Sequence, residues 1–274
     1  MSPGGTRKDP KSAPARKPVR AAKPKTDAGA ATYVYCITES GPAPLGSVTG
    51  LEGMGPPRFL EVEPRLWIVV SSAPVAVYGA EAIERGLGDL DWVSARALAH
   101  AAVIQAAQGK GTVIPLKIFT LFHDDARAIA HVRSRSKTFR SRLRRVRGAE
   151  EWSVRVSRGR EAGAEPLARK RTEAATGTGF LLAKKAKQDE VKDRARKGRE
   201  SALARRARDS RVQPLPPGAA GSSLLLDSVH LVETAERKAF LAETSRLAAV
   251  LGRDGLEVAV LGPWPPYNFV GDAR

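Results

Sequence analysis

The segment EWSVRVS, residues 151–157, alternates apolar and polar side chains without a break. Because successive side chains of a β-strand point to opposite faces, Trp152, Val154 and Val156 share one face. The polar residues between them share the other. The segment therefore predicts a strand that covers a hydrophobic core on one side, with Trp152 as a candidate structural or partner-binding residue.

Six further strands are predicted on either side of this segment, where β-branched and aromatic residues cluster between turn residues. They lie at residues 32–38, 58–63, 66–72, 112–122, 223–232 and 256–262. We interpret the run TVIPLKIFTLF at 112–122 as one buried strand, in which Pro115 marks an edge or a bulge.

Helices are predicted between these strands from apolar residues that recur every three or four positions. One helix at 91–108 has a predicted buried stripe of Trp92, Ala95, Ala99, Ala102 and Ala106. Another runs from an acidic start at 123–125 to about Gly148, and a long charged helix is expected at about 178–209. The helix between the last two strands has a predicted apolar face of Phe240, Thr244, Leu247 and Leu251.

The order of these elements predicts the α+β class, with mixed or antiparallel sheets covered by helices. We expect two domains that meet near Gly148, at residues 32–148 and 149–274. A ferredoxin-like β-α-β unit is one arrangement open to the second domain, which would include the charged helix. Residues 1–31 carry little apolar surface to offset the entropy of ordering, so a disordered basic arm is expected.

The formal net charge of +17 is concentrated in three segments. Residues 1–31 carry +6, residues 132–149 carry +8 and residues 184–211 carry +7, which leaves −4 for the rest of the chain. A basic nucleic-acid-binding protein that uses the N-terminal arm and residues 133–147 is therefore the alternative function. A solvated helical surface is the favoured interpretation of the second segment.

Sequence motifs for catalysis or for cofactor binding do not occur in the chain. His100, His123, His131 and His230 lack HExxH spacing, and no P-loop, GxGxxG or GxSxG pattern is present. The single cysteine, Cys36, excludes an intrachain disulfide and a cysteine-based metal cluster. We expect no enzymatic activity, no metal and no cofactor. Without an apolar run of about 20 residues or a signal-type segment, a cytoplasmic protein is expected.

The terminal segment GPWPPYNFV, residues 262–270, combines three aromatic residues with three prolines. Its consecutive prolines restrict the backbone to an extended conformation, so the aromatic side chains can anchor on the chain's own fold or on a partner. We favour a buried Trp264, because the preceding strand leaves little free chain. The candidate structural or partner-binding residues are Trp264, Pro265, Pro266, Tyr267 and Phe269.

This terminal segment closely resembles the C-terminal signature of the F/L-type gas vesicle proteins, the GvpL/GvpF family. Other segments follow in the family's order. TYVYCIT at 32–38 resembles the family's opening strand, and DWVSARALAHAAVIQAA at 91–107 resembles its helix with a central histidine, here His100. GAEEWSVRV at 148–156 resembles its EW-containing strand. The resemblance extends from Thr32 to Val270.

The resemblance implies a role in making gas vesicles, as an assembly factor or as a minor component of the shell. It implies binding to the small hydrophobic shell protein and to other accessory vesicle proteins, without catalysis. It also makes Trp92 and His100 candidate structural or partner-binding residues. Such a role is physically reasonable, because free strand edges of an α+β protein can cover the exposed strands of a shell subunit.

Overall fold

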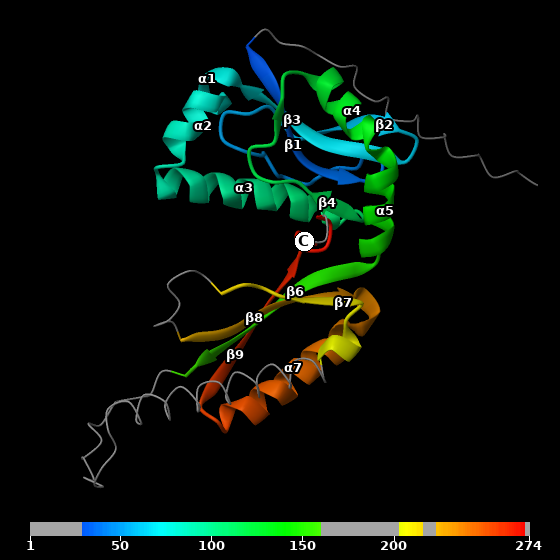
Figure 1. Cartoon of the computed structure of the whole chain (residues 1–274). Coiled ribbons are helices and arrows are strands. Elements are labelled where there is room, and N and C mark those ends of the chain that lie inside the picture. The colour runs from blue at the N-terminus through cyan, green and yellow to red at the C-terminus, as the bar shows by residue number, and fades with distance from the viewer. Residues whose placement is uncertain (1–28, 160–202, 216–222, 272–274) are drawn as a thin grey trace, which may run out of the picture.

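Two antiparallel sheets, each packed against helices, form the framework of the chain (Figure 1). The structure is a computed structural model that describes residues 29–159, 203–215 and 223–271. The predicted N-terminal arm up to residue 28 and most of the predicted charged helix lie outside these residues. The predicted α+β class is confirmed.

The first sheet has the strand order β2-β3-β1-β4, and β5 also pairs with β1. Its strands are β1 (Ala30–Thr38), β2 (Arg58–Glu63), β3 (Leu66–Pro74), β4 (Val113–Pro115) and β5 (Leu121–Phe122). β1 is apolar on both faces and both faces are covered, which is why it lies inside the sheet. Tyr33 and Tyr35 share a cluster with α3 (Leu90–Gln108), whereas Val34 and Ile37 share one with α4 (Asp125–Ser134) and α5 (Ser136–Val146).

The prediction of one strand at 112–122 is wrong, because residues 116–120 leave the sheet between β4 and β5. Both short strands pair with β1, and the backbone N–H of Leu116 donates to the carbonyl of Tyr35 (2.9 Å) where the loop begins. Phe119 has a positive φ of 62°, a conformation outside the β region. A mostly apolar run, here interrupted by Lys117 and Thr120, does not reveal such a loop, since hydropathy records burial and not backbone direction.

The buried face of α3 differs from the predicted alanine stripe. It comprises Arg96, His100, Val103, Ile104 and Ala107. Ala95 and Ala102 are exposed, so the predicted stripe was wrong at these positions. The error arose because two of the buried residues are polar, and their partners come from distant segments. The short helices α1 (Val75–Tyr78) and α2 (Ala80–Gly86), which precede α3, were not predicted.

The predicted helix at 123–148 is divided into α4 and α5 at Arg135, whose φ of −116° interrupts the helical backbone. The Asp124 carboxylate caps α4 by accepting a backbone N–H of its first turn (2.7 Å). The next residue, Asp125, is buried and accepts hydrogen bonds from Thr32 Oγ1 (2.7 Å) and the Arg58 guanidinium (2.8 Å). These bonds hold α4 against β1 and β2.

The second sheet has the order β7-β8-β6-β9 and is covered on one face by α7 (Arg237–Gly252). Its strands are β6 (Ala149–Arg158), β7 (Asp209–Val212), β8 (Leu224–Glu233) and β9 (Leu256–Trp264), and the 3-10 turn η4 (Thr234–Glu236) precedes α7. The predicted face of β6 packs on α7, as its alternation indicated. The predicted apolar face of α7 is confirmed, because all of its members are buried: Phe240, Thr244, Leu247 and Leu251.

The described end of the predicted charged helix is not α-helical. Its residues form the 3-10 turn η2 (Ala204–Arg206) and the start of β7, which was not predicted. Residues 178–202 of this prediction lie outside the described part of the chain.

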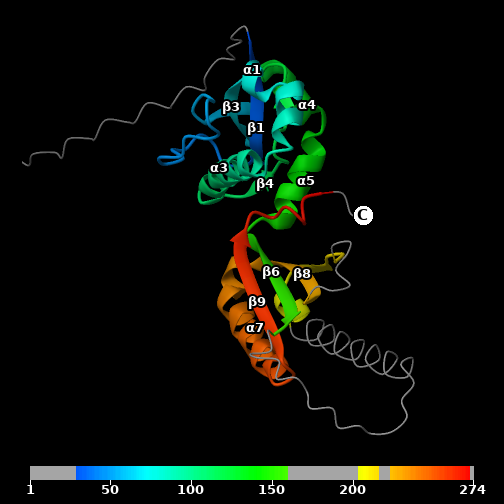
Figure 2. The same ribbon diagram turned by 90° about the vertical axis from the view of Figure 1, so that its left-hand side faces the viewer.

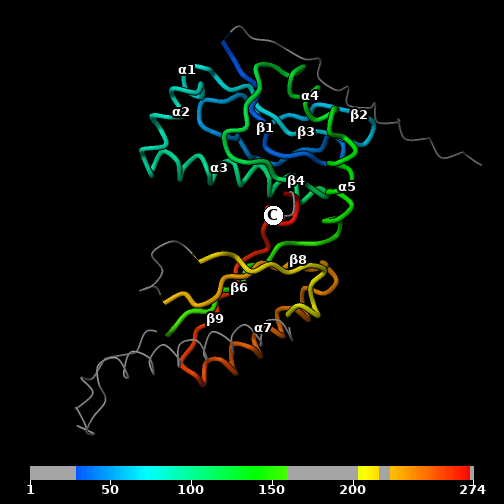
Figure 3. The backbone as a smooth tube through the Cα atoms, viewed as in Figure 1, coloured from blue at the N-terminus to red at the C-terminus, as the bar shows by residue number. Residues whose placement is uncertain are grey.

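The two sheets meet where α5 leads into β6 through Gly148, which has a φ of 66° (Figure 2). One apolar cluster extends over both sheets, with Val34 from β1, Val146 from α5, Leu231 from β8 and Phe269 from the terminal segment. The terminal segment returns from β9 to this junction (Figure 3). The division into two domains near Gly148 stays a prediction.

Candidate functional site

β9 forms one edge of the second sheet, since β6 is its one partner among the described strands. Val258 and Val260 on β9 pack in the cluster beneath α7. Leu261 is paired with Ser153 in the register and lies on the opposite face, where it is 38 % exposed. An edge strand with an exposed apolar side chain can accept another strand through backbone hydrogen bonds.

Two aromatic side chains continue this exposed surface into the terminal segment. Trp264 at the end of β9 and Tyr267 are each 41 % exposed, whereas Pro265 and Pro266 between them are buried. The expectation of a buried Trp264 is therefore wrong. Phe269, which is 0 % exposed, anchors the segment in the cluster shared by the two sheets.

Asn268 has a hydrogen-bond partner for each of its four polar groups. Its backbone N–H donates to Glu151 Oε2 (2.8 Å), and its Nδ2 donates to Glu151 Oε1 (2.6 Å). Its backbone carbonyl accepts from the Arg211 guanidinium, and its Oδ1 accepts from Gln213 Nε2 (3.0 Å). Asn268 thus attaches the terminal segment to β6 and β7. Its role was not predicted, because its hydrogen-bond partners Glu151, Arg211 and Gln213 are distant in the sequence.

Glu151 on β6 is buried, and its carboxylate receives both Asn268 donors. Desolvation raises the pKa of this carboxyl, while the Asn268 hydrogen bonds and the charge of Arg211 oppose the increase. Arg211 also lies over the Phe269 ring, with 5.1 Å between its guanidinium carbon and the ring centroid. The polar and apolar contacts together hold the terminal segment against the second sheet.

Comparison with known proteins identifies the family of the chain. The family model for gas vesicle synthesis protein GvpL/GvpF matches residues 31–271. The chain belongs to the GvpL/GvpF family. It is 29% identical over 266 residues to gas vesicle protein L of Streptomyces sp. (strain CB03234), covering 88% of this chain and 93% of that protein. Gas vesicle protein F of the same strain is 28% identical over 250 residues, covering 87% and 99%.

Solved structures of the GvpL/GvpF family have the same fold. The crystal structure of GvpF from Anabaena sp. PCC7120 superposes with a TM-score of 0.65 at 13% identity, covering 89% of this chain and 100% of that chain. GvpF from Microcystis aeruginosa gives a TM-score of 0.60 at 15% identity, covering 88% and 99%. The role of the chain is therefore related to gas vesicles, and its α+β fold is that of the family.

The other candidate residues of this GvpL/GvpF chain lie in or beside the cores, and Trp152 also lies close to Gly262 at the start of the terminal segment. Trp152 is buried, with its ring centroid 6.4 Å from that of Phe240. Trp92 is half-buried and stacks on Phe119 at 5.4 Å, and the Arg96 guanidinium lies 4.0 Å from its ring centroid. The structure thus gives both tryptophans packing roles.

His100 is buried between β1 and the loop after β4. Its Nε2 contacts the Leu116 carbonyl (3.1 Å) and its Nδ1 contacts the Tyr33 hydroxyl (2.7 Å). A carbonyl only accepts, so a neutral imidazole here carries its proton on Nε2 and accepts from Tyr33. Desolvation lowers the pKa of His100 to about 4, which keeps the ring neutral at physiological pH.

The described ranges contain neither a membrane-spanning helix nor a cluster of metal-ligating side chains. None of the helices there has the length and hydrophobicity needed to cross a membrane. No group of three or more His, Cys, Asp or Glu side chains in the same ranges is placed to hold a metal ion.

Proposed function

We propose that this protein acts in gas vesicle assembly, or as a minor part of the shell, by binding the small hydrophobic shell protein along the free edge of β9. Membership of the GvpL/GvpF family supports the vesicle role. The observation that carries the binding site is the exposure of Leu261 and Trp264 on the edge strand β9, with Tyr267 exposed in the segment that follows.

The edge of β9 offers two kinds of interaction to an apolar strand. The backbone groups of β9 that pair with none of the described strands can extend the sheet by one strand, which satisfies the polar backbone of the incoming segment. The aromatic rings of Trp264 and Tyr267 can cover apolar side chains of that segment, and such rings are enriched at the energetic centres of interfaces. A shell subunit held this way keeps its apolar strands from aggregating before it enters the shell.

Binding of this kind needs no chemical step, and we infer that the protein acts without turnover. The imidazole of His100 is 3 % exposed, and both of its ring nitrogens contact groups of the fold itself, so a substrate has no access to it. Other accessory vesicle proteins are expected as additional partners, and the cytoplasm is the compartment in which these contacts would form.

The alternative of nucleic-acid binding receives less support from the contacts of residues 133–147. Four arginines of this segment bind groups of the same chain. Their acceptors are the Val62 carbonyl for Arg133, Glu63 for Arg140, Asp209 for Arg145 and Glu39 for Arg147. A phosphate backbone would have to compete with these partners, so we favour protein binding.

One substitution on β9 and one matched control test the proposal. Leu261→Lys places a charge on the free edge, which an added strand would have to cover, whereas Val250→Lys places the same charge on α7, where the side chain is 56 % exposed. Copurification of the shell protein from cells that express a whole vesicle gene cluster should fall about tenfold for Leu261→Lys, or ~1.4 kcal/mol. It should stay unchanged for Val250→Lys. Equal capture by both variants would contradict the β9 site.

A further inference from the structure

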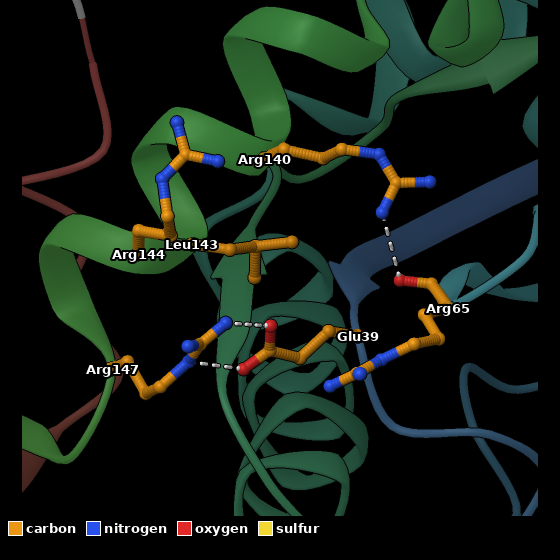
Figure 4. A pocket seen from close by; sticks show the side chains of 6 residues that line it. All are labelled: Glu39, Arg65, Arg140, Leu143, Arg144 and Arg147. Atoms are coloured by element: carbon orange, nitrogen blue, oxygen red, sulfur yellow. Dashed lines mark hydrogen bonds and ion pairs between the residues drawn. The ribbon is translucent and has the colours of Figure 1, made fainter.

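A pocket of about 320 Å³ lies between α5 and the turn that joins β2 to β3. Its lining residues are Glu39, Arg65, Arg140, Leu143, Arg144 and Arg147. Figure 4 shows the four guanidinium groups around the Leu143 side chain. Arg140, Leu143, Arg144 and Arg147 stand at positions i, i+3, i+4 and i+7, so one helical face supplies most of the lining. None of these residues belongs to the β9 surface.

Two of the four guanidinium groups already bind carboxylates of this chain. Arg147 donates to both Glu39 oxygens, at 2.8 and 2.5 Å. Arg140 donates to Glu63 Oε2 (3.1 Å) and to the Pro64 carbonyl (2.9 Å). Pairing of a guanidinium with a carboxylate is therefore the interaction for which this pocket is already arranged.

The other two guanidinium groups, those of Arg65 and Arg144, have no hydrogen bond or ion pair with any described residue. The backbone of Arg65 has a φ of 60° in the turn between β2 and β3, and its carbonyl accepts from Arg140 (3.5 Å). Four arginines stand against two carboxylates, Glu39 and Glu63, which leaves an excess of two positive charges at the pocket. This excess favours a bound anion.

We propose that this pocket binds carboxylate side chains of an acidic segment in a partner protein. Leu143 is 1 % exposed, so the guanidinium groups form the accessible part of the lining. Arg133 and Arg145 elsewhere on the segment are bound to their own chain, and Arg135 and Lys137 are exposed outside the pocket, so the pocket gathers two uncompensated guanidinium groups in one place. A localised charge of this kind matches one or two acidic side chains better than a nucleic-acid backbone, which needs a row of cations.

The test uses a fluorescent hexaglutamate peptide and the full-length protein, with binding followed by fluorescence anisotropy. The double variant Arg65→Gln with Arg144→Gln removes the two unpaired charges of the pocket. The control Arg135→Gln with Lys137→Gln removes the same charge from exposed positions of the same segment outside the pocket. We expect the pocket variant to bind at least about tenfold more weakly and the control to change less than about threefold. Thermal melts establish that both variants are folded.

Three results would overturn the proposal. Equal weakening in both double variants would show that the peptide responds to general charge and not to the pocket. Tighter binding of poly(U) RNA than of hexaglutamate, with equal loss in both variants, would assign the segment to nucleic acid. Displacement of the peptide by equimolar inorganic phosphate would assign the pocket to a small free anion. Weak competition by phosphate together with selective loss in the pocket variant supports the partner segment.

Discussion

Asn268 donates its backbone N–H and its side-chain amide to the two oxygens of the buried Glu151 carboxylate. The two residues are 117 positions apart in the sequence, and their contact brings the terminal segment back onto β6. The exposed Tyr267 is next to Asn268 and close to the buried Phe269, whereas the exposed Trp264 is held by the pairing of β9 with Glu151 on β6. The position of Tyr267 in the candidate surface therefore depends on the hydrogen bonds between Asn268 and Glu151, which lie inside the fold.

Replacement of Asn268 should destabilise the fold more than its partial exposure indicates. Asn268→Ala removes one of the two hydrogen bonds to a buried carboxylate and frees the Gln213 amide. We expect a loss of about 2 kcal/mol in the free energy of unfolding, measured by urea denaturation. Tyr267→Ala, one residue away, serves as the control and should change stability much less. Equal effects from the two variants would mean that the contact with Glu151 is unimportant for stability.

Phe269, and not Trp264, should be the stability anchor of the terminal segment. Phe269→Ala removes a fully buried ring and should cost about 3 to 5 kcal/mol. Trp264→Ala should leave the melting temperature nearly unchanged, because this side chain is 41 % exposed, and it should reduce shell-protein capture. Thermal melts and pull-downs separate the two effects. A large drop in melting temperature for Trp264→Ala would restore the role that the sequence assigned to this residue.

His100 should make the stability of the protein depend on pH below neutrality. Its pKa in the folded state is lowered to about 4 from the usual value of 6.5, so the unfolded chain takes up this proton first as the pH falls. The stabilisation is complete above pH 6.5 and is lost as the pH falls toward 4, by about 3 kcal/mol. His100→Gln should lack this loss. Parallel stability curves for the two proteins between pH 4 and 7 would rule out this assignment.

Asp125 should matter more than its neighbour Asp124, although both are acids at the start of α4. Asp125→Ala removes the acceptor of Thr32 Oγ1 and the ion-pair partner of Arg58, so we expect a loss of about 3 kcal/mol in the free energy of unfolding. Asp124→Ala removes an exposed helix cap and should cause a smaller loss. Urea denaturation of both variants checks the order, and the reverse order would contradict the buried role of Asp125.

Local patterns in the sequence were sufficient to predict the class of the fold and the strands around EWSVRVS. Alternation placed Trp152, Val154 and Val156 on one face of β6, and a helical period placed Phe240 and Leu247 on the buried side of α7. These predictions were confirmed because each element turns one face toward one core. Its buried residues then recur at every second position in a strand and at every third or fourth position in a helix. The terminal segment and the order of the other motifs also sufficed to indicate the GvpL/GvpF family.

Several features of the fold depend on contacts between distant segments and could not be predicted from the spacing of apolar residues. The loop that divides the predicted strand at 112–122, the burial of Arg96 and His100, and the exposure of Trp264 each depend on side chains far away in the chain. A polar residue is buried when a distant partner satisfies its hydrogen bonds, and the sequence around it holds no record of that partner. The residues of the chain alone thus determined its fold class, most of its strands and its family, whereas the tertiary structure decided which aromatic rings anchor the terminal segment and which remain open to a partner.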